Sequence, residues 1–282
     1  MCFQPRGIMV KKVDLHCHSN YSDGALSPIE LLSKANNVNI DIISITDHDS
    51  VEGVKEAIEI EKKNNLRIIP GVELSAFMNH TEVHIIGYFI DINNEQLVSN
   101  LQIFKNDRIQ RAERIVRKIN KMNIPLRFES VLSHSGNGSI SRPHIAAAMI
   151  KEGFIESYLE AFQRYIGNDC PAYEKKLAYS PQQIISIIHE AGGLSILAHP
   201  GNTLREEEIF QIIDAGIDGI EVIHPGHTPN MIRYYRKIVN EFFLLETGGS
   251  DFHGGLKNDD ENLGQFTISH KAVESMEQRL FL

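Results

Sequence analysis

The strongest constraint on the fold of this chain is a repeated pattern, in which an apolar, strand-like run leads directly into histidine and acidic side chains. The first instance is VDLHCHSNYSDG, residues 13–24. On a β-strand alternate side chains point the same way, so His16 and His18 would share one face and Cys17 would lie on the other. Two imidazoles that converge at a strand end can hold a metal ion. The alternative is a polar strand end that happens to contain two histidines.

The same pattern recurs in ITDHDS, LAHPG and SDFH. Nine potential ligands lie on or just after expected strands: His16, His18, Asp23, His48, Glu73, His84, His199, Asp251 and His253. One ion takes about four to six ligands, so the set predicts two or three divalent metal ions. Four of the 13 histidines lie in a helix-like or polar segment and are expected to bind no metal: His80, His134, His189 and His270.

Strand-like and helix-like segments alternate along the chain, which is typical of an α/β fold. Apolar runs predict strands at 13–18, 40–49, 66–76, 81–90, 193–201, 216–226 and 242–253. Helices are predicted at 51–65, at 181–191 and at 27–39, where Ser27 would be the N-cap and Pro28 the first helical residue. Strands joined by helices, with polar residues at their C-terminal ends, suggest a parallel α/β barrel or a doubly wound sheet.

Residues 100–179 interrupt this alternation. The segment IFKNDRIQRAERIVRKINKMN has apolar residues at helical spacing: Ile109, Ala112, Ile115, Val116 and Ile119. Four of its basic residues form a stripe that is interpreted as a solvated helix face: Arg108, Arg111, Arg114 and Lys118. We therefore predict a barrel domain from residues 1–99 and 180–282, with residues 100–179 as a mostly helical insertion.

Composition excludes several classes of function. A net charge of −9 disfavours a broad grip on long nucleic acid. No apolar run reaches the length that spans a membrane, and no signal peptide is recognised, so we expect a cytoplasmic protein that does not contact membranes. Three widely spaced cysteines suggest neither a disulfide framework nor a cysteine-only zinc site. Residues 1–8 would precede the compact fold.

The ordered motifs HCHSNYSDG, ITDHD, PGVELS, VHIIGY, LAHP and GSDFH resemble the PHP (polymerase and histidinol phosphatase) superfamily of metal-dependent phosphoesterases. The resemblance implies a distorted (β/α)7 barrel. It is strongest to the branch with an inserted helical domain and a SRPHIA-type motif, which acts on nucleoside 3',5'-bisphosphates or trims short RNA from the 5' end.

The resemblance also implies how the ligands are shared. It places His16, His18, Glu73 and Asp251 on one ion. Glu73 would bridge to a second ion that His84 and His199 also bind, and Asp23, His48 and His253 would bind a third. Some members have histidine where this chain has Asp23, which leaves the metal open. Manganese is favoured, with iron, zinc and magnesium as alternatives.

Divalent ions of this kind polarise phosphoryl oxygens and activate water, and no nucleophilic Ser or Cys motif competes with that chemistry. Cys17 is interpreted as a packing residue. Asp14 and Asp47 are candidates to orient ligand imidazoles, although capping of the following turn explains Asp47 equally well.

Substrate contacts are expected elsewhere. In SRPHIA, Arg142 and His144 at a helix N-terminus form a candidate phosphate site, the alternative being a capping turn with an exposed arginine. The HPGHTPN stretch resembles a pocket-lining signature of the family, which makes His224 and His227 candidates. The predicted catalytic set is Asp23, His48, Arg142, His144 and His227.

Four functions are compatible with these motifs to different degrees. The sequence favours a phosphoesterase acting on a small phosphorylated substrate, either a nucleotide or the 5' end of short RNA. A phosphatase for a non-nucleotide monoester such as histidinol phosphate is the alternative, against which the SRPHIA-type insertion argues. A non-catalytic PHP module is disfavoured by the full ligand set. A metal-dependent amidohydrolase is disfavoured because Glu73 and the late Asp-x-His fit the PHP pattern better.

Overall fold

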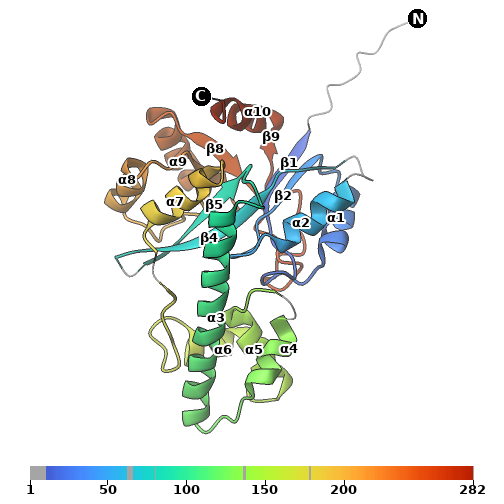
Figure 1. The fold of residues 1–282 in the computed structure, drawn as a ribbon, viewed down its shortest axis with the longest axis vertical. Coiled ribbons are helices and arrows are strands. Elements are labelled where there is room, and N and C mark those ends of the chain that lie inside the picture. Colours follow the sequence, from blue (N-terminus) through green and yellow to red (C-terminus); the bar gives the residue numbers. More distant parts are fainter. Residues whose placement is uncertain (1–10, 62–65, 80, 136–137, 178, 282) are drawn as a thin grey trace, which may run out of the picture.

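The computed structural model describes residues 11–61, 66–79, 81–135, 138–177 and 179–281. The predicted N-terminal extension, residues 1–8, and His80 lie outside the described residues. The structure is a mixed α/β fold whose strands form the upper part of the molecule in Figure 1. In the described part of the chain, no helix is both long enough and apolar enough to cross a membrane.

The strands form two sheets. The first has the order β3 (Arg67–Ile68), β2 (Ile42–Ile45), β1 (Lys12–Cys17) and β9 (Ile268–Ser269). The second has the order β4 (Gly71–Met78), β5 (Thr81–Tyr88), β6 (Leu194–Leu197), β7 (Gly219–Ile223) and β8 (Leu245–Gly248). Isolated bridges connect the sheets in two places, Cys17 with Phe252 and His48 with Glu73. Continuous ladders do not close the described strands into a barrel.

The parallel arrangement expected from the sequence, a parallel α/β barrel or a doubly wound sheet, does not hold at three pairs of strands. β1–β2, β2–β3, β6–β7 and β7–β8 are parallel, but β5 runs antiparallel to both β4 and β6, and β9 runs antiparallel to β1. For β4 and β5 the reason is the length of the connection. Only residues 79 and 80 separate them, whereas a parallel crossover needs a dozen or more residues.

Both sheets share an interior core. Its apolar side chains come from strands of each sheet and include Val13, Leu15, Ile86, Ile196 and Leu245. Helix α10 (His270–Arg279) closes this core at one end with Val273 and Met276. The candidate ligands are therefore left to the opposite end of the strands.

Helices cover the outside of the sheets. They are α1 (Pro28–Asn37), α2 (Glu52–Glu61), α7 (Pro181–Glu190), α8 (Glu206–Asp214) and α9 (Pro229–Glu241). As predicted, Ser27 caps α1: its hydroxyl accepts from the backbone N–H of Glu30, whose carboxylate accepts from the N–H of Ser27 at 2.8 Å. A large outer core lies between these helices and the strands, and it includes the buried Cys17. The prediction of a packing role for Cys17 is confirmed.

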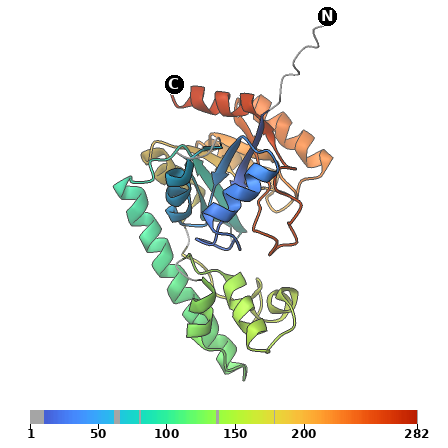
Figure 2. The same ribbon diagram turned by 90° about the vertical axis from the view of Figure 1, so that its right-hand side faces the viewer.

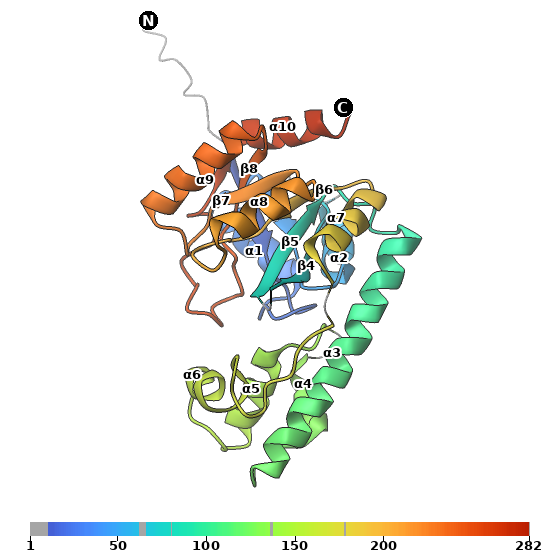
Figure 3. The same cartoon turned by 90° about the vertical axis from the view of Figure 1, so that its left-hand side faces the viewer.

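The remaining helices lie below the sheets in Figures 1, 2 and 3, alongside the lower half of one long helix, α3 (Glu95–Lys121). They are α4 (Phe128–Ser135), α5 (Arg142–Lys151), α6 (Tyr158–Ala161) and a π-helix (Phe162–Ile166). They enclose a separate apolar core that contains Ala112, Ile115 and Ile119, as the helical spacing predicts. The predicted domain boundary at residue 99/100 falls inside α3, which spans both parts.

Candidate metal centre and adjoining anion pocket

The nine candidate ligands come together at one end of the strands. Seven of them end or follow a strand: His16 and His18 with β1, Asp23 in the following loop, His48 after β2, His199 after β6, and Asp251 and His253 after β8. Glu73 and His84 instead lie within β4 and β5. The antiparallel register places Ser75 opposite His84, so Glu73 and His84 are near neighbours on the two strands.

Glu73 is the centre of the cluster. Its carboxylate is fully buried, and five histidine side chains contact it. The shortest distances from its oxygens to ring nitrogens are 3.5 Å to His16, 3.3 Å to His18, 3.1 Å to His48, 2.9 Å to His84 and 3.0 Å to His199. One carboxylate therefore faces ligands of several candidate ion positions at once.

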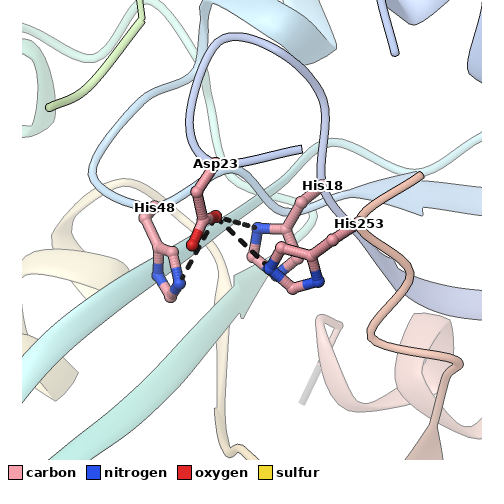
Figure 4. A group of neighbouring side chains, drawn as sticks. All are labelled: His18, Asp23, His48 and His253. Atoms are coloured by element: carbon pink, nitrogen blue, oxygen red, sulfur yellow. Dashed lines mark ion pairs between the residues drawn. The ribbon is translucent and has the colours of Figure 1, made fainter. Parts of the chain in front are cut away.

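Asp23 forms a second focus, shown in Figure 4. Its Oδ1 lies 3.3 Å from Nε2 of His253, 3.8 Å from Nδ1 of His18 and 3.9 Å from Nε2 of His48. These four side chains present donor atoms close enough together to bind one ion.

Asp251 forms the third focus. Its Oδ1 lies 3.3 Å from Nε2 of His16 and 3.1 Å from Nε2 of His18. His224 approaches the other oxygen of Asp251 at 3.5 Å. The structure thus brings His224 to the edge of the cluster.

The chemistry of this donor set fits divalent metal ions. Buried donor atoms without a hydrogen-bond partner include Oδ1 of Asp23, Nδ1 of His48, Oε2 of Glu73 and Nδ1 of His84. Buried polar atoms normally have partners, so atoms that converge without one fit an ion between them. Imidazole nitrogen mixed with carboxylate oxygen suits manganese, iron or zinc.

Electrostatics keep the central carboxylate charged. Burial by itself would raise the pKa of Glu73, but the imidazoles of His48, His84 and His16 outweigh burial and hold this pKa well below its ordinary value. Conversely, burial by itself would lower the pKa of His18, but Asp251 and Glu73 raise it to about 9. The cluster binds protons where it would bind metal ions, because both are cations held by the same carboxylates.

Glu221 in β7 is a supporting residue that the sequence reasoning missed. It is fully buried, and its Oε1 accepts from Nδ1 of His16 at 2.9 Å. Its Oε2 accepts from the backbone N–H of His199 at 2.8 Å. The contact between Glu221 and Nδ1 of His16 fixes the tautomer of His16, so that Nε2 is left for the metal centre. An acidic residue inside the apolar run GIEVI was the available signal.

The residues predicted to orient ligands act less directly. Asp14 is buried and accepts from the backbone N–H groups of Ser250, at 2.9 Å, and Gly264, at 3.2 Å. Asp47 accepts from the hydroxyl of Ser22, at 2.6 Å, which in turn lies 3.4 Å from Nδ1 of His18. Neither aspartate contacts an imidazole among the described hydrogen bonds.

His227 lies beside the cluster with both ring nitrogens engaged by the backbone. Its Nδ1 donates to the carbonyl of Val222 at 3.0 Å, and its Nε2 accepts from the N–H of Gly201 at 3.1 Å. This arrangement positions the loop after β6. The structure therefore shows no free nitrogen with which His227 could meet a substrate.

The backbone of the site is strained at two ligands. His199 has φ of 24° and Asp251 has φ of 48°, a region that non-glycine residues rarely adopt. Next to Asp251, Gly249 leaves space for β1, because a Cβ there would lie 2.4 Å from the backbone nitrogen of His16. Close approach of these two strand ends requires glycine.

A cavity of ≈ 240 Å³ adjoins the cluster. Its lining includes Asp23, His48 and His84 of the cluster. Five cationic side chains also line it, together with the acidic Glu82: Arg108, Arg111, Arg142, Lys176 and Lys257. Such a concentration of positive charge beside a metal centre suits an anion, although the chain as a whole is acidic.

The interpretation of Arg108 and Arg111 as part of a solvated helix face is wrong. Both are only 4% exposed. Arg108 donates from Nε to Asp49 at 2.6 Å, and Arg111 donates from Nε to the carbonyl of Glu174 at 2.7 Å. Burial and the nearby Arg142 lower the pKa of Arg111 to about 10. Arg114 and Lys118 are partly exposed and pair with Glu174.

Arg142 and His144 lie at the start of α5 as predicted. Arg142 donates from Nη1 to the side chain of Asn168 at 3.0 Å, and its guanidinium lies over the ring of Phe162 at 5.5 Å. His144 accepts at Nδ1 from the backbone N–H of Ser141 at 3.1 Å, and burial lowers its pKa. Arg142 lines the cavity, whereas His144 contacts Ser141 in the cap of α5.

The described histidines expected to bind no metal have other partners. His189 contacts Asp218 at 2.7 Å, His134 contacts the carbonyl of Ser130 at 2.8 Å, and His270 contacts Glu274 at 3.1 Å. None of the three belongs to the groups of converging ligand atoms found among the described residues.

Comparison with known proteins gives consistent results. The PHP domain family model matches residues 14–199. A 5'-3' exoribonuclease of Haemophilus influenzae is 34% identical over 251 residues, which cover 87% of this chain and 91% of that protein. A 3',5'-nucleoside bisphosphate phosphatase of Chromobacterium violaceum is 30% identical, over 86% of this chain and 87% of that protein. Among solved structures, a candidate metal-dependent phosphoesterase from Bifidobacterium adolescentis has a TM-score of 0.88 and 29% identity, over 95% of this chain and 96% of that one.

Proposed function

The chain belongs to the PHP domain family, and from that premise we propose that it is a metal-dependent phosphoesterase for small nucleotides or the 5' ends of short RNA. One observation carries the proposal: a single cavity is lined both by residues of the candidate metal centre and by five cationic side chains. Nucleoside 3',5'-bisphosphates and 5'-phosphorylated RNA carry two phosphate groups, which match two anion-binding regions in one cavity.

We further propose that all nine ligands bind two or three divalent ions, with manganese favoured and iron, zinc or magnesium as alternatives. The grouped donor atoms support this proposal. The two bridges between the sheets and the core that both sheets share support the distorted (β/α)7 barrel of the family. The separate core of the helical part supports residues 100–179 as an insertion.

When bound, divalent ions at this centre would polarise phosphoryl oxygens and lower the pKa of water enough to supply hydroxide near neutral pH. The residues of the chain position the substrate for that chemistry. Asp23 and His48 border both the cluster and the cavity, so they would face the reacting phosphate. Arg142 and the neighbouring Arg111 would bind the second phosphate and thereby fix the distance to the first.

His144 and His227 keep narrower roles in this proposal. His144 would hold the N-terminus of α5, and with it Arg142, in place through its contact with Ser141. His227 would position the loop that carries His199 through its contact with Gly201. His224, beside Asp251, is the better placed of the two histidines in HPGHTPN to contact a substrate.

The proposal predicts a substrate preference. Removing the second phosphate should lower kcat/KM by a large factor, because a phosphate bound away from the reacting centre helps to position it. Changing the base should matter little. The measurement compares nucleoside 3',5'-bisphosphates, 5'-phosphorylated oligoribonucleotides, nucleoside monophosphates and histidinol phosphate under matched metal conditions. A better kcat/KM with histidinol phosphate would favour the non-nucleotide alternative and leave only the phosphoesterase class.

Replacing Arg142 with alanine should raise KM or lower kcat/KM roughly tenfold to hundredfold, because a charged hydrogen bond contributes about 1.5–3 kcal/mol. Steady-state kinetics with a nucleoside bisphosphate check this, and metal content should not change. Arg164→Ala is the matched control: Arg164 also lies in the helical part, but it is exposed and pairs with Glu160. Equal kinetics for Arg142→Ala and the control would leave Arg142 as a capping-turn residue.

A further inference from the structure

The ammonium group of Lys257 contacts a ligand atom of the candidate metal centre. Its Nζ is 2.7 Å from Nε2 of His253 and 3.9 Å from Oδ2 of Asp23. The other cations of the cavity have partners outside the ligand set. Arg108 binds Asp49, and Lys176 binds Glu82 and Ser75.

The contact uses the nitrogen that a metal ion would need. Nδ1 of His253 lies 2.7 Å from the carbonyl oxygen of Asp251, which can only accept, so Nδ1 carries the ring proton. Nε2 of His253 is then a lone-pair donor, and it faces Oδ1 of Asp23 at 3.3 Å. An ammonium group that donates to this lone pair cannot share it with a metal ion.

We propose that Lys257 is a tethered cation that competes with a metal ion for the position formed by His18, Asp23, His48 and His253. This inference rests on the proposed metal centre and adds a property that the ligand set alone does not have. The remaining ion positions, around Glu73 and Asp251, would be free of this competition. The position at Asp23 would therefore be the one whose occupancy varies with the metal concentration.

The surrounding loop allows the exchange. The backbone after β8 is held by Asp259, which accepts from the N–H of Gly255 at 2.7 Å and also from the N–H of His253. The side chain of Lys257, in contrast, is 46% exposed. An incoming ion can displace the ammonium into the cavity that Lys257 already lines, without moving the ligands.

The size of the effect follows from how often Lys257 occupies the position. When a site is available only for a fraction of the time, the apparent dissociation constant rises by the inverse of that fraction. An ammonium bound for about nine-tenths of the time would weaken the ion roughly tenfold. Removing the charge of Lys257 should restore the intrinsic affinity of this position for a metal ion.

The test uses the full-length chain, freed of metal by chelation and dialysis. Manganese is titrated into the wild type, Lys257→Met and Lys257→Gln by calorimetry, with bound metal counted after dialysis. Both variants should bind the most weakly held manganese ion with a dissociation constant about tenfold lower than that of the wild type. Lys237→Met is the control, because Lys237 is an exposed lysine on α9. A melting temperature for each variant verifies that it is folded.

The outcomes separate this inference from the proposed function. If the wild type binds two or three ions but neither Lys257 variant binds the weakest one more tightly, the competition is refuted and the metal centre stands. If Lys257→Met binds the weakest ion less tightly, Lys257 supports the site rather than competing for it, which also refutes the inference. If no form of the protein binds manganese, nor zinc or iron titrated in the same way, the metal centre and the inference fail together.

Discussion

Replacing Glu73 with glutamine should lower kcat/KM by about a thousandfold or more. The substitution preserves the size of the side chain but removes the one charge that faces five imidazoles at 2.9–3.5 Å. A bridging carboxylate serves two ions, and the Lewis acidity of an ion contributes several kcal/mol to a phosphoryl transfer, about tenfold for each 1.36 kcal/mol. We expect the loss in this variant to be the largest among single ligand replacements. Kinetics and metal analysis of the same preparation check it.

Glu246→Gln is the matched control for that experiment. Glu246 is also a carboxylate on a strand of the second sheet, but it pairs with Arg236 at the surface. The control should retain wild-type activity and metal content. Wild-type metal content in Glu73→Gln would contradict the bridging role, and so would a smaller loss of activity than in His84→Ala.

Removing the metal should abolish activity and lower the melting temperature by roughly 5–10 °C. Without ions, the buried carboxylates and unpartnered imidazole nitrogens lose the cations that satisfy them. An ion present at 100 times its dissociation constant stabilises the folded state by about 2.7 kcal/mol, which corresponds to several degrees for a chain of this size. Thermal denaturation and activity are measured before and after chelation, then again after manganese is restored.

The control for that experiment is chelator already saturated with zinc or manganese, which should have no effect. The decisive count comes from protein purified without any chelator. One ion or none per chain, together with activity that chelation leaves unchanged, would be incompatible with the proposed centre.

The candidate site could be predicted from the sequence because most of its ligand residues directly follow apolar runs that predict strands. Apolar runs that stop at His48, His199 or Asp251 identify side chains that the carboxyl ends of neighbouring strands bring together. Glu73 and His84 also lie on predicted strands, yet they meet through the antiparallel hairpin of β4 and β5. The direction of β5 depends on a connection of two residues, which local apolar patterns do not report.

The arginines of α3 show where pattern reasoning fails. Leu97, Leu101 and Phe104 form a buried stripe, and Arg108 and Arg111 continue it at the same helical spacing. An arginine in a stripe is normally assigned to solvent because burying a charge costs free energy. Here Asp49, 59 residues earlier in the chain, offsets the cost for Arg108. Only the folded chain shows that partner.

The length of α3 has a consequence for how the chain unfolds. Its 27 residues extend about 40 Å, from the core beneath the sheets to the core of the helical part. Each core packs against part of the same helix, so we expect unfolding of one part to destabilise the other. Arg108, which pairs with Asp49, and Arg111, which has no carboxylate partner among the described residues, occupy the stretch between the cores and line the cavity, where a bound anion would neutralise Arg111. Substrate in the cavity would then protect the amide hydrogens of both parts from exchange, including those far from any phosphate.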